Sequence, residues 1–165
     1  PEVINLLLQH GADVDATGAR GRSAAAIVAA AGNAESLRPL VEAGARCDVP
    51  DHDGLNAAMH ALTALQEPCV RLLMEGGYMP SLGMALAELF KAIRQEDSMD
   101  RPVRLISILS DVYPDIANFS EDGYVGASSP KQPTLLMESI RSKHMTMVSA
   151  LLQAGARIYP RCSAK

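Results

Sequence analysis

The stretch that decides the fold is EVINLLLQHGADVDA, residues 2–16. Its first half places apolar side chains at the spacing of one helix face. Gly11 follows directly, and glycine suits a helix exit because the chain there turns with a positive φ that a side chain disfavours. This stretch therefore predicts a short helix that ends near residue 10, followed by an extended turn.

The same element returns along the chain. Copies stand at residues 40–48 (LVEAGARCD), 72–78 (LLMEGGY) and 151–158 (LLQAGARI). The anchoring glycines, at 11, 44, 77 and 155, are separated by 33, 33 and 78 residues. A 33-residue period is typical of a stacked repeat array, so the sequence predicts an all-α solenoid.

The long interval equals two periods plus 12 residues, and a worn copy fits inside it. Residues 105–116 (LISILSDVYPDI) keep the apolar spacing, with Tyr113 in place of the glycine. The extra residues then divide into 3 around residues 95–101 and 9 within residues 119–132.

Each period reads as two short helices. Ser23 is a predicted N-cap ahead of a helix over residues 24–31, and a second helix follows over residues 35–43. Asn56 begins the next pair, and Pro102 stands in the first turn of a helix that runs to about residue 111. The apolar runs at 84–94 and 145–148 are interpreted as buried faces rather than as peptide-binding helices.

Composition excludes several classes of function. The chain has 165 residues, of which 48% are hydrophobic and 4% aromatic, and its net charge is −4. This balance offers no general attraction to nucleic acid or to anionic lipid. The longest apolar runs fall well short of 18 residues, so no spanning helix is expected. The chain begins at Pro1, and we interpret it as a piece of a longer protein.

The cysteines and histidines indicate structural roles. Cys47, Cys69 and Cys162 have no paired spacing, which favours a reducing intracellular location, cytoplasmic or nuclear. Cys47 and Cys69 are predicted to be buried hydrophobes. Asp51-His52-Asp53 has the composition of a tight turn, and His10 is placed to stabilise a helix C-terminus. The sequence therefore predicts no catalytic residue, no metal site and no cofactor.

The period and these motifs resemble the ankyrin repeat family. That family closes each repeat with Leu-Leu-x-x-Gly-Ala-Asp-Val-Asn, which residues 2–16 match closely. The opening Thr-Pro-Leu-His is worn, becoming SAAA at 23–26, NAAM at 56–59 and TLLM at 134–137. The resemblance implies one ankyrin repeat domain of about four and a half repeats. Its expected parts are a truncated repeat at 1–16, repeats at 17–49 and 50–82, a degenerate repeat at 83–118, a repeat with a loop insertion at 119–159, and a tail at 160–165.

The resemblance implies a non-catalytic scaffold or protein–protein interaction module, with contacts on turn tips and on the inner face of each first helix. The family's contact positions, transferred residue by residue, predict binding by Ala19, Arg20, Arg22, Ala30, Ala31, His52, Asp53, Leu55, Thr63, Ala64, Pro130, Lys131, Pro133, Arg141 and Ser142. Arg20 and Arg22 would form cationic tips that suit an acidic or extended partner segment. His144 stands at an inter-helix position that the family often fills with His, which implies a structural role.

Three further expectations follow. The array could instead be a regulatory or spacing segment of a larger enzyme or channel that contacts its own chain. The apolar face of the first helix predicts self-association through residues 1–10. Residues 119–132 are predicted to form a surface loop that lengthens the recognition surface, with Tyr124 and Val125 as anchors if it is ordered.

Overall fold

In the computed structural model, residues 1–95, 100–119 and 134–157 are described. The chain divides into two compact units, Pro1–Ser81 and Leu82–Lys165, which we treat separately. Regular secondary structure in the described ranges is helical, with an isolated antiparallel bridge between Thr17 and Ser23. The all-α prediction is therefore confirmed. The expected grouping of all repeats into one domain stays a prediction.

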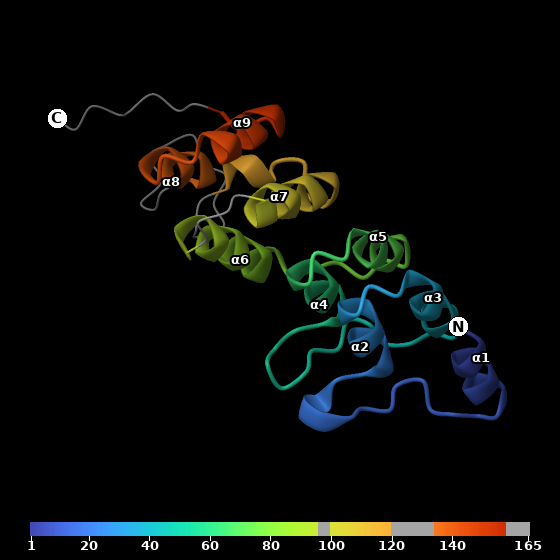
Figure 1. Ribbon diagram of the computed structural model, residues 1–165. Coiled ribbons are helices and arrows are strands. Elements are labelled where there is room, and N and C mark those ends of the chain that lie inside the picture. Colours follow the sequence, from blue (N-terminus) through green and yellow to red (C-terminus); the bar gives the residue numbers. More distant parts are fainter. Residues whose placement is uncertain (96–99, 120–133, 158–165) are drawn as a thin grey trace. The chain divides into compact units, whose positions relative to one another are not determined.

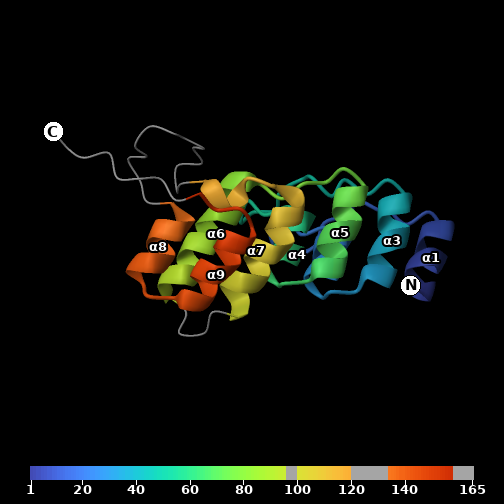
Figure 2. The same ribbon diagram turned by 90° about the horizontal axis from the view of Figure 1, so that it is seen from above.

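Unit 1 consists of helix pairs packed in two layers (Figure 1). The inner layer consists of the first helices of the pairs, and α2 packs against α4 there. The outer layer holds the second helices, with α3 packed between α1 and α5, as Figure 2 shows. The elements in chain order are α1 (Glu2–Gln9), the 3₁₀ turn η1 (Ala19–Gly21), α2 (Ala24–Ala30), α3 (Ala34–Glu42), α4 (Ala57–Thr63) and α5 (Glu67–Glu75).

Side-chain caps fix where the first helices begin. The hydroxyl of Ser23 accepts a hydrogen bond from the backbone N–H of Ala26 at 3.2 Å, and Asn56 caps α4 through the N–H of Met59 at 2.9 Å. These bonds satisfy amides that have no partner within the helix. The predicted starts at Ser23 and Asn56 are confirmed.

The repeated glycines end the second helices as expected. Gly11, Gly44, Gly77 and Gly155 all have a positive φ, between 79° and 86°. Tyr113 is not among the described residues with a positive φ, and its backbone N–H donates to the carbonyl of Leu109 at 2.7 Å. The worn copy thus ends its helix without the left-handed turn that the glycine repeats use.

Unit 2 begins with two helices, α6 and α7, that are longer than those of unit 1, and its last pair has the same lengths as α2 and α3. The elements of the unit are α6 (Leu82–Gln95), α7 (Asp100–Val112), η2 (Ile116–Asn118), α8 (Leu135–Arg141) and α9 (Met145–Gln153). The inner helices α6 and α8 pack together, and so do the outer helices α7 and α9. With 14 residues, α6 is twice as long as α2, so the fourth pair is longer at its start than the period alone suggests.

Buried side chains confirm most of the predicted core. Small residues of α2 and α4, such as Ala29 and Ala61, are fully buried and let these helices approach closely. Most apolar side chains of the run at 84–94, Phe90 among them, are buried. In the run at 145–148 the prediction holds for Met147 but is wrong for Met145, which is exposed.

Helix α1 leaves an apolar face uncovered. The exposed fractions of Val3, Leu6 and Leu7 are 70%, 56% and 54%. Ile4 and Leu8 are half-buried, and α1 packs against α3. The open apolar face is therefore present as expected, whereas self-association through it stays a prediction.

Candidate functional site

The first turn tip of unit 1 is a closed loop around η1. The backbone N–H of Gly18 donates to the carbonyl of Arg22 at 2.9 Å, and Thr17 pairs with Ser23. Arg20 sits at the apex with a φ of 61°, a left-handed conformation that is uncommon for a residue with a side chain. The arginine side chains are therefore carried on a backbone of fixed shape.

The second turn tip, residues 51–55, is held in shape by the carboxylate of Asp51. Its Oδ1 accepts from the backbone N–H groups of Asp53 and Leu55, at 2.9 and 3.0 Å. Its Oδ2 accepts from Nε2 of His60 at 2.8 Å. Burial by itself raises the pKa of Asp51, but the hydrogen bonds from Leu55, His60 and Asp53 lower that pKa to about 2. Asp51 is therefore an ionised, buried organiser of the turn.

Ion pairs connect the two tips. The Nε of Arg22 lies 3.3 Å from Oδ2 of Asp51, and its NH2 lies 3.4 Å from Oδ2 of Asp53. Arg20 NH1 lies 3.6 Å from the same oxygen of Asp53. The expected cationic tips are thus corrected: both arginines lie against carboxylates, and the tip surface is close to neutral.

Backbone contact makes the two tips one surface. The N–H of His52 donates to the carbonyl of Arg20 at 3.0 Å. The His52 ring lies over Gly21, where a Cβ would fall 2.8 Å from Cδ2 of that ring. Because Gly21 also has a φ of 70°, a larger residue would meet both a clash and backbone strain.

Four predicted residues with small side chains lie at the C-terminal ends of α2 and α4, the ends away from the tips. Ala31 is exposed, and Ala30, Thr63 and Ala64 are half-buried. Leu55, on the second tip, is half-buried as well. Ala19 is exposed on the first tip. The predicted residues of unit 1 thus lie in two places, on the tips and at the C-terminal ends of the inner helices, and whether they bind a partner stays a prediction.

One register position that the repeats share carries functional side chains that the sequence did not predict. Ile27, His60 and Glu138 stand at equivalent places, 33 and 78 residues apart. Ile27 is 53% exposed, whereas His60 and Glu138 are buried, and their side chains are hydrogen-bonded to Asp51 and Arg94. Aligning the helices by the glycine spacing would have identified this position.

The predicted binding residues of the last repeat are only partly described. Arg141 is exposed and Ser142 is half-buried at the end of α8. Of residues 119–132, only Phe119 is described, and it is half-buried. The predictions for Tyr124, Val125, Pro130, Lys131 and Pro133 lie outside the described residues.

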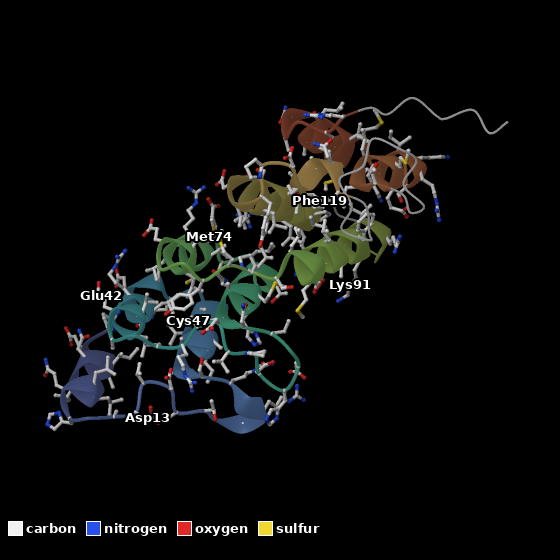
Figure 3. All side chains as sticks on the ribbon, turned by 180° about the vertical axis from the view of Figure 1, so that it is seen from behind. Asp13, Glu42, Cys47, Met74, Lys91 and Phe119 are labelled. Carbon is white, nitrogen blue, oxygen red and sulfur yellow. The ribbon has the colours of Figure 1, made fainter. Side chains whose placement is uncertain are left out.

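The cysteines of unit 1 are packing residues. Cys47 lies inside the unit (Figure 3), and both Cys47 and Cys69 are buried. Burial is the main cause that raises the pKa of Cys47 to about 11, and burial also raises the pKa of Cys69. Thiols with raised pKa values carry little nucleophilic thiolate at neutral pH, which confirms the prediction of buried hydrophobes.

The described histidines and acidic residues form no metal centre. No group of three or more potential ligands is gathered within the described ranges. His10 Nδ1 lies 2.8 Å from the carbonyl of Leu6 at the end of α1, as expected for a residue that stabilises a helix terminus. None of the helices in the described part of the chain is both long and apolar enough to cross a membrane.

Comparison with known proteins decides the family. A family model for ankyrin repeats, three copies long, matches residues 1–82. The chain belongs to the ankyrin repeat family. The family model does not extend over residues 83–165, where the solved structures show likeness of fold alone. No curated protein matches this sequence significantly.

Solved ankyrin repeat domains have the same fold. The human ASB11 domain is 18% identical with a TM-score of 0.64, covering 93% of this chain and 63% of that one. A domain from Acinetobacter baumannii, ABAYE2397, is 21% identical with a TM-score of 0.65, covering 93% and 74%. The Bcl-3 domain, from the IkappaB family, is 22% identical with a TM-score of 0.64, covering 99% and 69%. Ankyrin repeat domains are generally protein–protein interaction modules.

Proposed function

We propose that this ankyrin repeat chain is a non-catalytic module that binds a protein partner on the turn tips and inner helices of its repeats. The proposal is supported by the general role of the family and by the surface of unit 1. That surface presents preformed backbone tips, and inner helices that carry small side chains at their C-terminal ends.

The observation that carries the proposal is the joining of two consecutive tips. The hydrogen bond from His52 to Arg20 and the pairing of Arg22 with Asp51 and Asp53 hold both tips in one arrangement. A surface that is ordered before binding loses less conformational entropy when a partner docks. Such rigidity is what a recognition surface built from loops requires.

The test is capture of partner proteins by the 165-residue chain and by a variant that blocks the inner face. Ala31→Arg places a long side chain on exposed backbone at the end of α2, so it is expected to leave the fold intact and to abolish capture. Reversal of Arg22 is unsuitable, because it would set a second carboxylate against buried Asp51.

The matched control is Glu75→Arg, which adds an arginine at the exposed end of the outer helix α5. Circular dichroism checks that both variants keep their helix content. Partners captured equally by wild type and Ala31→Arg would contradict the proposed surface. A wild-type chain that captures no protein would contradict the proposed function.

A further inference from the structure

A groove lies between the outer helices α7 and α9 of unit 2, which are neighbours in Figure 2. Val103, Ile106 and Ser110 of α7 line it, together with Ala150 and Ala154 of α9. Its volume is about 290 Å³. Pockets that enclose whole small ligands begin at roughly 300 Å³, so this groove is sized for a few side chains of a partner.

The groove exists because two bulky positions of the repeat hold small residues here. Counted back from the glycine position of each repeat, Ser110 occupies the place of Val41, and Ala150 occupies the place of Leu72. In unit 1, Leu72 is buried, and Cγ1 of Val41 lies 3.2 Å from where a Cβ on Gly76 would be. Two aliphatic side chains thus pack between α3 and α5, and their counterparts between α7 and α9 are too small to do so.

The lining of the groove suits an apolar occupant. Ile106 is buried at its floor, and Ala150 is half-buried. The hydroxyl of Ser110 donates to the carbonyl of Ser107 at 2.9 Å, within its own helix. Ser107 and Gln153 are exposed, so their polar groups stay at the rim. An aliphatic side chain can therefore enter without depriving a polar group of its hydrogen-bond partner.

The shape of the groove fits a helix. From Val103 to Ser110 it follows α7 for about two turns, a length of about 10 Å. Amphipathic helices bind in such grooves through apolar residues spaced three, four or seven apart. A helix of a partner can therefore lie along α7 and α9 and place one aliphatic side chain between them.

A charge at the rim adds a second requirement. Arg104 is exposed on α7, three residues before the rim residue Ser107, and pairs with no carboxylate in the described part of the chain. Asp100 and Asp111, on the same helix, already have interactions of their own. An acidic side chain beside the inserted aliphatic one would therefore complement Arg104.

We propose that an amphipathic helix of a protein partner docks along the groove between α7 and α9, inserts a branched aliphatic side chain over Ala150 and places an acidic side chain on Arg104. This inference goes beyond the proposed function, because it assigns a second docking surface. That surface lies on the outer helices of unit 2 rather than on tips and inner helices.

The test selects phage-displayed peptides on the 165-residue chain. The library consists of fourteen-residue, alanine-based helices that are randomised along one face. Enriched peptides are expected to carry Leu, Ile or Val at one position and Asp or Glu within one turn of it. The most enriched peptide is then labelled, and its binding is measured by fluorescence polarisation.

Two variants close the groove from opposite sides. Ala150→Leu restores the residue type of Leu72, and Ser110→Val restores that of Val41. Each is expected to weaken binding of the labelled peptide at least about tenfold, because the inserted aliphatic side chain loses its buried place. The matched control is Ser149→Leu, which adds leucine to the exposed side of α9 and should change binding less than about twofold.

The charged contact is tested separately. Arg104→Gln is expected to weaken binding about threefold, as for the loss of one exposed ion pair. Arg38→Gln removes an exposed arginine of α3 in unit 1 and should leave binding unchanged. Equal weakening by both variants would overturn the contact with Arg104, because net charge alone would then explain it.

Circular dichroism checks that every variant keeps its helix content. The inference would be overturned if no peptide were enriched, if the enriched peptides lacked an aliphatic residue, or if Ala150→Leu bound as tightly as wild type. Selection only by a chain that ends at residue 157 would make residues 158–165 the occupant. Self-association that Ala150→Leu abolishes would make a second copy the occupant, and either result would also overturn it. These failures are separate from a failure of the proposed function, which is judged by protein capture and its loss in Ala31→Arg.

Discussion

The residue between the two helices of a repeat adopts a left-handed conformation. Gly32, Leu65 and Lys143 occupy this position, with φ values of 76°, 58° and 60°. Glycine adopts such a φ without strain, whereas a residue with a Cβ pays roughly 1–2 kcal/mol. Two of the repeats therefore have an unfavourable residue, Leu65 or Lys143, at a position where the fold requires a positive φ.

Replacing Lys143 by glycine should stabilise the protein. Lys143 is exposed, so Lys143→Gly removes backbone strain without loss of buried contacts. We expect the free energy of unfolding in urea to rise by roughly 0.5–1 kcal/mol, since the entropy of glycine in the unfolded chain offsets part of the gain. Lys143→Ala keeps the Cβ and should give no increase. An equal gain in both variants would show that the lysine side chain, and not the backbone, is the cause.

Asp51 is the residue whose loss should most disturb the tips of unit 1. Its side chain is 2% exposed and accepts bonds from two backbone amides and from His60. Asp51→Asn should lower the free energy of unfolding by roughly 2–3 kcal/mol, because charged hydrogen bonds are lost in a buried place. Asp53→Asn, at a more exposed carboxylate, should cost under about 0.5 kcal/mol. If urea unfolding showed similar losses of stability for Asp51→Asn and Asp53→Asn, the prediction would be wrong.

The same carboxylate should make stability depend on pH. The pKa of Asp51 is about 2 in the folded chain, against an ordinary value of 3.8. The unfolded chain therefore takes up the proton first, so the stabilisation is complete above about pH 4 and is lost as the pH falls towards 2. Asp51→Asn should flatten the measured stability over this range, and Asp53→Asn should leave the slope in place.

At the scale of elements, the ion pair between Arg94 and Glu138 connects α6 and α8. These residues are 44 apart in the sequence, and α6 packs against α8. Arg94→Met should lower the free energy of unfolding by about 2–3 kcal/mol, because it leaves buried Glu138 with only the distant Arg141. Lys91→Met removes a cation from the same helix and should have little effect.

A double variant separates the cause of that loss. Arg94→Met combined with Glu138→Leu removes the stranded charge, so the loss of stability should be largely recovered. If the double variant were no more stable than Arg94→Met, the packing of the Arg94 side chain rather than the ion pair would explain the loss.

At the scale of the whole molecule, the uncovered face of α1 should control association. Val3 and Leu7 expose most of their apolar surface. Val3→Glu with Leu7→Glu should abolish concentration-dependent association measured by sedimentation velocity, because burying two charges in an apolar contact is unfavourable. Arg38→Glu, on the exposed side of α3, is the control and should leave association unchanged. Wild type that stays monomeric at high concentration would contradict the prediction.

Local chemistry explains what the sequence by itself determined. The helix starts at Ser23 and Asn56 depend on a single side chain that caps its own helix, and the exits depend on glycines with a positive φ. Such features are encoded within a few residues and repeat with the period, so the all-α repeat fold was predictable. Near Tyr113 the apolar spacing still predicted a helix end at about residue 111, and α7 ends at Val112. The glycine signal is missing there, so the form of that exit, without a left-handed turn, was not predictable.

Tertiary structure alone decided the charged surfaces. Arg22 meets Asp51 across 29 residues, and Arg94 meets Glu138 across 44. These residues occupy positions where the repeats differ from one another, so the repeat pattern does not predict the ion pairs. The sequence alone does not distinguish an arginine that is paired with a carboxylate from one that is exposed. Only packing places the tip arginines of unit 1 against carboxylates, and only packing leaves Arg141 exposed beside a buried carboxylate.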